Sequence, residues 1–319
     1  INASGLSQEE ITRLVILHTN DVHSRIEPFP EDGSRNAGLG GAARRATMIE
    51  KIRSENEHVL LVDAGDIFQG TPYFNFYLGE LDIKLMSKMG YDATTMGNHD
   101  FDAGLENFEK QMREHGTFPT IISNYDFSDT IMHDKYVPRR IFQKGNIKIG
   151  VTGVGIELDG LVPQALYGPT RYLDPIAHAT AQADILKHDE KCDLVICLSH
   201  LGYKYDYAKV SDIQLAQNSK SIDIIIGGHT HTFMDKPDIY RNKEGENVII
   251  RTIKRTDLMG NSIISYPILN CEEMGTRFKY RYQYMLEDFP QGRLWNELPL
   301  ERTDQINLKA HVYHVPINH

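Results

Sequence analysis

The chain has 319 residues, of which 40% are hydrophobic and 24% charged, fractions that are ordinary for a globular protein and exclude a fibrous or disordered one. The formal net charge of -10 argues against a nucleic-acid-binding protein, which would normally present a basic face. No apolar run has the length of a transmembrane segment. The three cysteines, Cys192, Cys197 and Cys271, follow no CxxC pattern and therefore predict neither a disulfide framework nor a zinc knuckle.

Strands and helices are expected to alternate along most of the chain. Short runs of branched aliphatic residues predict strands, and longer segments rich in helix formers predict helices. The first half is expected to contain strand 13–18, helix 42–53, strand 58–62, helix 81–89, strand 93–96, helix 106–115 and strand 120–123. The second half is expected to contain strand 147–154, helix 175–191, strands 194–198 and 223–226, and hairpin strands 248–253 and 261–268. This alternation predicts an α/β layered fold with a mixed sheet.

The length of the chain allows one large α/β domain or two small ones. Residues 1–12 are expected to form a polar N-terminal arm, and residues 13–289 the main folded part of the chain. Residues 290–319 are polar, and we expect them to form an irregular tail or linker.

Polar side chains that can bind metals stand just after the ends of five predicted strands. In open α/β sheets, sites collect at the carboxyl ends of strands, so these five segments are expected to converge. The set consists of Asp21, His23, Asp66, Asn98, His200, His229 and His231. Asp21 and His23 are two residues apart, as are His229 and His231, so an extended backbone would point each pair to one side.

The chemistry of this set predicts a pair of divalent metal ions. Two carboxylates, one amide and four imidazoles suit Zn, Mn, Fe or Co better than Ca or Mg, which prefer oxygen ligands alone. Asp66, in the middle of the set, is the natural bridge between the two ions. Two divalent ions and two carboxylates carry a net charge of about +2, which would attract a phosphate ester to an acidic protein. A bridging hydroxide is the expected nucleophile.

Next to the set, His99 and Asp102 predict acid catalysis. His99 follows Asn98 directly and is placed to donate a proton to the leaving oxygen, while Asp102 orients the imidazole. Asn98 is expected to contact the substrate as well as a metal.

These motifs resemble those of the calcineurin-like metallophosphoesterases, and within that group the catalytic domain of the 5'-nucleotidase and UDP-sugar hydrolase family. The resemblance rests on segments 17–23, 40–45, 63–66, 90–93, 97–102, 198–202 and 226–231. It covers residues from about 13 to 268. It implies a four-layered α/β/β/α sandwich with mixed sheets, and a periplasmic or secreted protein.

Carried over residue by residue, the resemblance implies two metal sites. The first would be formed by Asp21, His23, Asp66 and His231, and the second by Asp66, Asn98, His200 and His229. His99 and Asp102 match the family's catalytic dyad. Family members continue into a second domain that supplies the substrate pocket. Here we expect the pocket to be improvised by this chain, supplied by a separate chain, or left behind by truncation.

The expected function is two-metal hydrolysis of phosphate esters, with 5'-nucleotides or nucleotide sugars as the first substrate class. A phosphodiesterase for cyclic nucleotides, or a hydrolase of another phosphoester, remains an alternative because the metals alone do not choose the leaving group. A metal-bound binding module without turnover is an alternative of another class. The pair His99 and Asp102 argues against that module, because a scaffold needs no proton donor.

Overall fold

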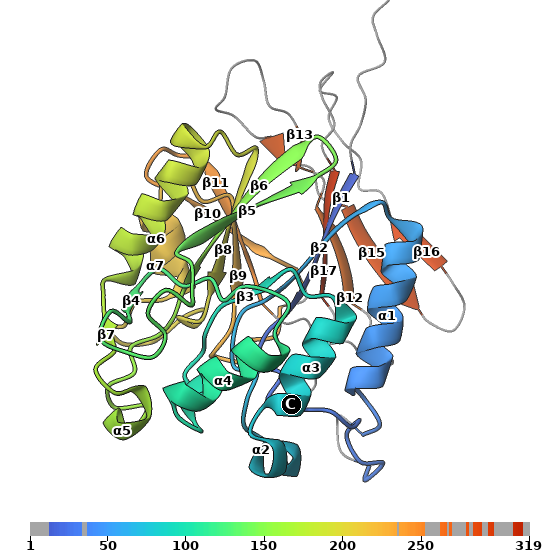
Figure 1. Cartoon of the computed structure of the whole chain (residues 1–319). Helices are drawn as coiled ribbons and strands as arrows, with labels where there is room; N and C mark the ends of the chain where they lie inside the picture. The colour runs from blue at the N-terminus through green and yellow to red at the C-terminus, as the bar shows by residue number, and fades with distance from the viewer. Residues whose placement is uncertain are drawn as a thin grey trace, which may run out of the picture.

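The structure, a computed structural model, describes residues 13–33, 37–234 and 236–252 (Figure 1). Beyond residue 252 it describes the backbone of six short strands, β12 to β17. The predicted arm, residues 1–12, lies outside the described residues, and so does Cys271. Cys192 and Cys197 are buried free thiols. Within the described part, no helix is both long and apolar enough to cross a bilayer.

The first large sheet has the strand order β16-β15-β12-β17-β1-β2-β3. Its strands are β1 (Arg13–Thr19), β2 (His58–Asp63), β3 (Ala93–Thr94), β12 (Ser262–Tyr266), β15 (Gln283–Asp288), β16 (Arg293–Asn296) and β17 (Lys309–His314). Strands β17, β1, β2 and β3 run parallel, whereas β12, β15 and β16 are joined by antiparallel pairing. The sheet is therefore mixed, and its parallel part has the carboxyl ends of β1, β2 and β3 at one edge.

The second large sheet has the order β10-β11-β9-β8-β6-β5. Its strands are β5 (Arg139–Lys144), β6 (Ile147–Val154), β8 (Leu194–Ser199), β9 (Ile224–Gly227), β10 (Asp238–Arg241) and β11 (Asn247–Arg251). The four central strands are parallel, and β5 and β10 are antiparallel edge strands. Two small sheets pair β4 (Tyr125–Asp126) with β7 (Arg171–Tyr172) and β13 (Ile268–Leu269) with β14 (Lys279–Tyr280).

Helices cover the outer face of each large sheet (Figure 1). On the right of the view lies α1 (Ala42–Glu55), and in its lower centre lie α2 (Pro72–Tyr77), α3 (Glu80–Met89) and α4 (Leu105–His115). On the left lie α5 (Gln164–Tyr167), α6 (Pro175–Asp184) and α7 (Asp212–Asn218). A short 3-10 helix spans His99–Phe101, and a π-helical stretch, Ile185–Asp189, follows α6.

The buried side chains of β1 explain the layering. Leu14 and Ile16 pack in a central cluster with residues of the second sheet, whereas Val15 and Leu17 pack on the other side against α1 and α3. A strand that is buried on both faces reads as a continuous apolar run. A third cluster joins the second sheet to α6 and α7. The order helices, sheet, sheet, helices confirms the expected four-layered α/β/β/α fold.

Three predicted elements differ from the structure. Segment 120–123 forms only isolated bridges, because its amides donate to Thr94, Val137 and Gly153 on three different segments and build no ladder. The predicted helix 175–191 is α-helical only to Asp184 before it widens into the π-helical stretch. Strand 93–96 shortens to two residues.

The predicted hairpin between strands 248–253 and 261–268 is also wrong. Strand β11 pairs with β10 and β9 in the second sheet, whereas β12 lies in the first sheet beside β15 and β17. In the predicted irregular tail, the structure instead has β16 and β17, and β17 lies directly beside β1. The division into a domain of residues 13–289 and a tail of residues 290–319 stays a prediction.

Candidate metal centre

The seven predicted ligand residues meet in one place, beyond the carboxyl ends of β1, β2, β3, β8 and β9. Two groups have ligand atoms that all lie within 4.8 Å of one another: Asp21, His23, Asp66 and His231, and Asp66, His200 and His229. Asn98 joins the second group, because its Oδ1 lies 2.9 Å from Nδ1 of His229. Asp66 belongs to both groups, as the sequence predicted.

The backbone at this centre is left-handed at most of the candidate ligands. Positive φ angles occur at Asp21 (52°), His23 (50°), Asp66 (57°), His229 (71°) and His231 (46°). We expected an extended backbone to align each pair, and that reason is wrong because β1 and β9 end before these residues. For a residue with a Cβ the left-handed region costs roughly 1–2 kcal/mol. Such strain collects at functional sites when surrounding contacts maintain it.

Hydrogen bonds between the loops maintain this backbone. The amide of Asp21 donates to the carbonyl of Gly65 at 2.9 Å, and the amide of His23 donates to the carbonyl of Asp66 at 3.0 Å. The amide of His229 donates to Oδ1 of Asp21 at 2.9 Å. Three loops from two sheets are thus bonded to one another, which offsets the strain.

Gly97 allows the closest approach in the centre. A Cβ atom built there would lie 2.2 Å from Oδ1 of Asp66 and 2.6 Å from Nε2 of His200. Gly65, at φ +87°, would place a Cβ 2.5 Å from the amide nitrogen of Gly97. The backbones of the two glycine-containing loops therefore lie against each other, and side chains at these positions would separate the ligands.

Asp100 holds these two loops together, and our reading of the sequence assigned it no role. Its carboxylate accepts hydrogen bonds from the backbone amides of Asp66, Ile67, Phe68 and Gly97, at 2.8–3.2 Å. Asp100 is 1% exposed, so all four bonds are sheltered from water. The position of Asp100 between the motif residues His99 and Asp102 was the signal available in the sequence, but three of the four donors, the amides of Asp66, Ile67 and Phe68, lie more than 30 residues away in the chain.

Replacing Asp100 by Asn is expected to destabilise the protein by about 2 kcal/mol, because the amide nitrogen of Asn cannot accept a hydrogen bond and leaves buried donors unpaired. Urea unfolding of the metal-free protein measures this free energy. Asp159→Asn, at an exposed carboxylate, is the control and should lie within about 0.5 kcal/mol of the wild type. Equal unfolding free energies for the two variants would show that Asp100 does not hold the loops.

His99 and Asp102 form the predicted pair. Nδ1 of His99 lies 2.8 Å from Oδ2 of Asp102, and 36% of the His99 side chain is exposed. The hydrogen bond to Asp102 raises the pKa of His99, although partial burial opposes this. Because Nδ1 is engaged by Asp102, Nε2 is the ring atom that can donate to a substrate. The ring of His99 lies 5.2 Å from that of His23, so this donor is next to the first group.

The buried charges of the centre fit divalent cations. Oδ2 of Asp66 and Nε2 of His200 approach to 3.0 Å, yet Nε2 of His200 makes no hydrogen bond. The ligand atoms of Asp66, His200 and His229 all lie within 4.8 Å of one another, a spacing that one shared cation could bridge. Carboxylates buried as deeply as Asp21 and Asp66, at 0% and 1% exposed, need a cation or a metal as partner.

The imidazoles differ in how readily they carry a proton. Burial, with the neighbouring His200, lowers the pKa of His229 to about 3, and burial also lowers the pKa of His23. These two rings are neutral near pH 7, which is the form that ligates a metal. Burial opposes a charge on His200, but the carboxylates of Asp66 and Asp21 outweigh it and raise the pKa of His200 to about 10. A metal at His200 must therefore displace a proton.

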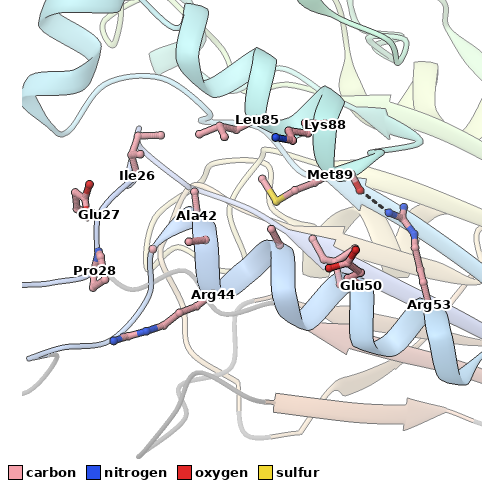
Figure 2. Close-up of a pocket in the computed structure, with 14 residues that line it drawn as sticks. Ile26, Glu27, Pro28, Ala42, Arg44, Glu50, Arg53, Leu85, Lys88 and Met89 are labelled. Carbon is pink, nitrogen blue, oxygen red and sulfur yellow. Dashed lines mark hydrogen bonds between the residues drawn. The ribbon is translucent and has the colours of Figure 1, made fainter.

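A cavity of about 830 Å³ lies elsewhere, between α1, α3 and the chain near Ile26 (Figure 2). Its lining includes none of the candidate ligands. Two arginines at its wall are engaged by the backbone. Arg44 donates to the carbonyl of Gly38, and Arg53 donates to the carbonyl of Met89 (Figure 2). The cavity therefore shares no lining residue with the candidate metal centre.

Comparison with known proteins identifies the family. The model of the calcineurin-like phosphoesterase family matches residues 14–233, a segment that contains all seven candidate ligands and the His99–Asp102 pair. The chain belongs to the calcineurin-like phosphoesterase family. The match confirms the resemblance seen in the sequence, and the fold of this family is that of metal-dependent phosphoesterases.

Individual relatives in this family are 5'-nucleotidases. The chain is 36% identical over 231 residues to the 5'-nucleotidase of Bos taurus, covering 69% of this chain and 38% of the bovine protein. It is 35% identical over 232 residues to the snake venom 5'-nucleotidase of Gloydius brevicauda, covering 69% and 37%. The chain thus spans less than half the length of these relatives.

Solved phosphoesterase structures confirm the fold. The 5'-nucleotidase precursor from Thermus thermophilus superposes with a TM-score of 0.69 at 26% identity, over 83% of this chain and 53% of that one. The phosphoesterase YfkN from Bacillus subtilis shares the fold with a TM-score of 0.62, over 84% of this chain and 87% of that one. The α/β fold with mixed sheets is therefore the fold of this family.

Proposed function

We propose that this chain hydrolyses phosphate esters at a two-metal centre, with 5'-nucleotides or nucleotide sugars as its substrates. The observation that carries the proposal is the pair of ligand groups that share Asp66 and have the His99–Asp102 pair beside them. A scaffold would have no use for a proton donor at this position. The names of the 5'-nucleotidase relatives support the choice of substrate class.

In this proposal the seven residues hold two ions. The first ion would be held by Asp21, His23, Asp66 and His231, and the second by Asp66, Asn98, His200 and His229. When bound, the ions would make water a nucleophile near neutral pH and would stabilise the charge that develops on the phosphoryl group. The donor set has four imidazoles, which favours Zn, Mn, Fe or Co.

The remaining polar groups act on the substrate. Asp102 favours the protonated form of His99, and Nε2 of that imidazolium donates its proton to the leaving oxygen. Oδ1 of Asn98 lies toward His229, so its amide nitrogen can donate a hydrogen bond to a phosphoryl oxygen. Asn98 would thus bind metal and substrate with different atoms.

The metal centre does not determine the leaving group of the ester or the part of the substrate that lies outside the phosphoryl group. One relative, 33% identical over 261 residues, is named the trifunctional nucleotide phosphoesterase protein YfkN of Bacillus subtilis, which keeps cyclic nucleotides and other esters open as substrates. This chain spans 37–38% of the length of the snake venom and bovine relatives. We therefore propose that a further polypeptide segment, in the same or in a separate chain, contributes to substrate recognition. A periplasmic or secreted location is part of the proposal and is supported by the venom relative.

Metal removal provides the test. Chelation is expected to abolish hydrolysis of AMP, UDP-glucose, a 2',3'-cyclic nucleotide and an aryl phosphate, and Mn or Zn should restore it. Ranking the substrates by kcat/KM identifies the class, with AMP or UDP-glucose expected first. A metal at 100 times its Kd adds about 2.7 kcal/mol of stability, so Tm should rise by roughly 5 °C on reloading. Hydrolysis that survives chelation would contradict the proposal, and full metal loading without hydrolysis would favour a binding module.

A further inference from the structure

A buried carboxyl group that the proposed mechanism does not use lies close to the second ligand group. Asp212 is the first residue of α7 and is 0% exposed. Its Oδ1 accepts a hydrogen bond from Oγ of Ser199 at 2.5 Å. Within the part of the chain that the structure describes, Oδ2 of Asp212 is buried and makes no hydrogen bond. A buried oxygen without a donor costs free energy, so this carboxyl group is a poor choice for packing alone.

Asp212 contacts the last residue pair between β8 and β9. Ser199 is the last residue of β8, and its register partner is Gly227, the last residue of β9. A Cβ atom at Gly227 would lie 2.2 Å from Oδ2 of Asp212, so the carboxyl group lies directly against the glycine backbone. One carboxyl group therefore holds both strands, by a hydrogen bond to β8 and by packing on β9.

Two candidate ligands follow this residue pair at once. His200 comes directly after Ser199, and His229 is the second residue after Gly227. The two chains are also bonded here, because the amide of Gly228 donates to the carbonyl of Ser199 at 2.9 Å. The atoms of a metal site must be held within about 0.5 Å of their working positions. A shift of either strand end would therefore move an imidazole away from a shared ion.

The backbone of Asp212 supports the same place. Its amide donates to the carbonyl of Gly202 at 2.9 Å, two residues beyond His200. Side chain and main chain of Asp212 thus bind on both sides of His200 in the sequence. The loop of residues 200–211 begins and ends at one point, which fixes α7 relative to the end of β8.

Another buried aspartate joins the same two strands at their other end. Asp223 lies just before β9, and its Oδ2 accepts a hydrogen bond from the amide of Val195 at 2.7 Å. Nζ of Lys187 lies 3.1 Å from the same oxygen. Because β8 and β9 are parallel, Asp223 lies at their amino ends and Asp212 at their carboxyl ends, where the candidate ligands are. The two aspartates therefore separate general stabilisation of the sheet from support of the ligands.

We propose that Asp212 is a positioning residue for the second ion, which holds the ends of β8 and β9 so that His200 and His229 face one metal. It acts through its hydrogen bond to Ser199 and its contact with Gly227, and it belongs to neither ligand group. Groups that orient metal ligands typically contribute about 10–100-fold to metal affinity. This role rests on the two-metal centre proposed above and adds that the two ions depend on different supports.

Asp212→Ala tests this role through metal binding rather than turnover. Calorimetric titration of the metal-free protein with Mn should show two binding events in the wild type, one of them about 10–100-fold weaker in Asp212→Ala. After dialysis this variant should retain one ion by mass spectrometry. The double variant His23→Gln/Asp212→Ala should retain none, because His23 belongs to the first group alone. Asp212→Asn should keep both affinities within about 3-fold, since its amide oxygen still accepts from Ser199 and its shape is the same.

Asp223→Ala is the matched control, because it removes a buried carboxyl group from the other end of the same strands. It should lower the free energy of unfolding in urea while both metal affinities stay within about 3-fold. If Asp212→Ala does not fold, Ser199→Ala takes its place. That variant removes only Oγ and its bond to Asp212, and the second affinity should fall about 10-fold. If Asp223→Ala does not fold, Asp223→Asn replaces it.

The outcomes separate this inference from the proposed function. Equal losses of metal affinity in the variants of Asp212 and Asp223 would show a general structural role and overturn the proposal. Equal losses in Asp212→Asn and Asp212→Ala would show that the charge, and not the bond and the shape, supports the ion, and would overturn it too. Both results leave the two-metal centre in place, because the wild type still binds two ions. A wild-type protein that binds fewer than two ions would refute that centre and, with it, the role of Asp212.

Discussion

Asp66→Asn is expected to lower the affinity for both metal ions at once. Its Oδ2 lies 3.0 Å from Nε2 of His200 and 3.8 Å from Nε2 of His23, so one carboxylate faces ligands of both groups. The neutral amide of Asn removes a negative charge from the site that we propose to hold two dications. We expect each affinity to fall at least about 100-fold, which is the upper end of effects seen for residues that only support a ligand.

Metal content after dialysis, measured by mass spectrometry, gives the number of bound ions for each variant. His23→Gln is the matched comparison, because His23 belongs to the first group alone and its loss should release one ion. If Asp66→Asn also released just one ion and kept the other at wild-type affinity, Asp66 would not bridge the two sites.

His99→Ala is expected to keep both ions and lose most of the turnover. The imidazole of His99 belongs to neither ligand group, so its removal leaves the metal sites intact. In the proposed mechanism His99 supplies the proton to the leaving oxygen, and general acid catalysis of this kind contributes roughly 10²–10⁴-fold. We expect kcat for AMP to fall within that range, with metal content unchanged.

A second histidine beside a carboxylate provides the control. His133 lies 3.1 Å from Asp134 in the same kind of pair, but its side chain is 59% exposed and it is not part of the centre. His133→Ala should retain wild-type kcat. A His99→Ala protein that turned over AMP as fast as His133→Ala would remove His99 from the mechanism. An aryl phosphate with a good leaving group should be less sensitive to His99→Ala, because its leaving oxygen needs the proton less.

The order of the elements could be read from the sequence because it depends on local patterns. The run from Leu14 to Leu17 is apolar at every position, which is typical of a strand buried on both faces, and both of its faces are buried. Helices α1, α3 and α4 begin and end within two residues of the predicted limits. Segment 120–123 has an equally apolar pattern, but its backbone partners lie on three segments, and no local pattern records them.

The long-range pairing of the chain needed the tertiary structure. Strand β17 lies beside β1, almost 300 residues away in the sequence, and β11 and β12 are close in sequence but lie in different sheets. Register and partner are decided by which surfaces bury one another, and a polar, weakly patterned segment such as residues 290–319 carries little of that information.

For the candidate site, the sequence by itself determined which residues could meet, because polar ligands at the ends of parallel strands lie at the carboxyl edge of their own sheet. The structure divides them between two sheets, with β1, β2 and β3 in one and β8 and β9 in the other. The sequence also placed Asp66 in the middle of the set and His99 beside it. Only the tertiary structure decided how they meet. The hydrogen bond from the amide of Asp21 to the carbonyl of Gly65, and the bonds from the amides of Asp66, Ile67 and Phe68 to Asp100, join segments that are distant in the chain. Residue types specify chemistry locally, whereas strain and pairing depend on neighbours that folding brings together.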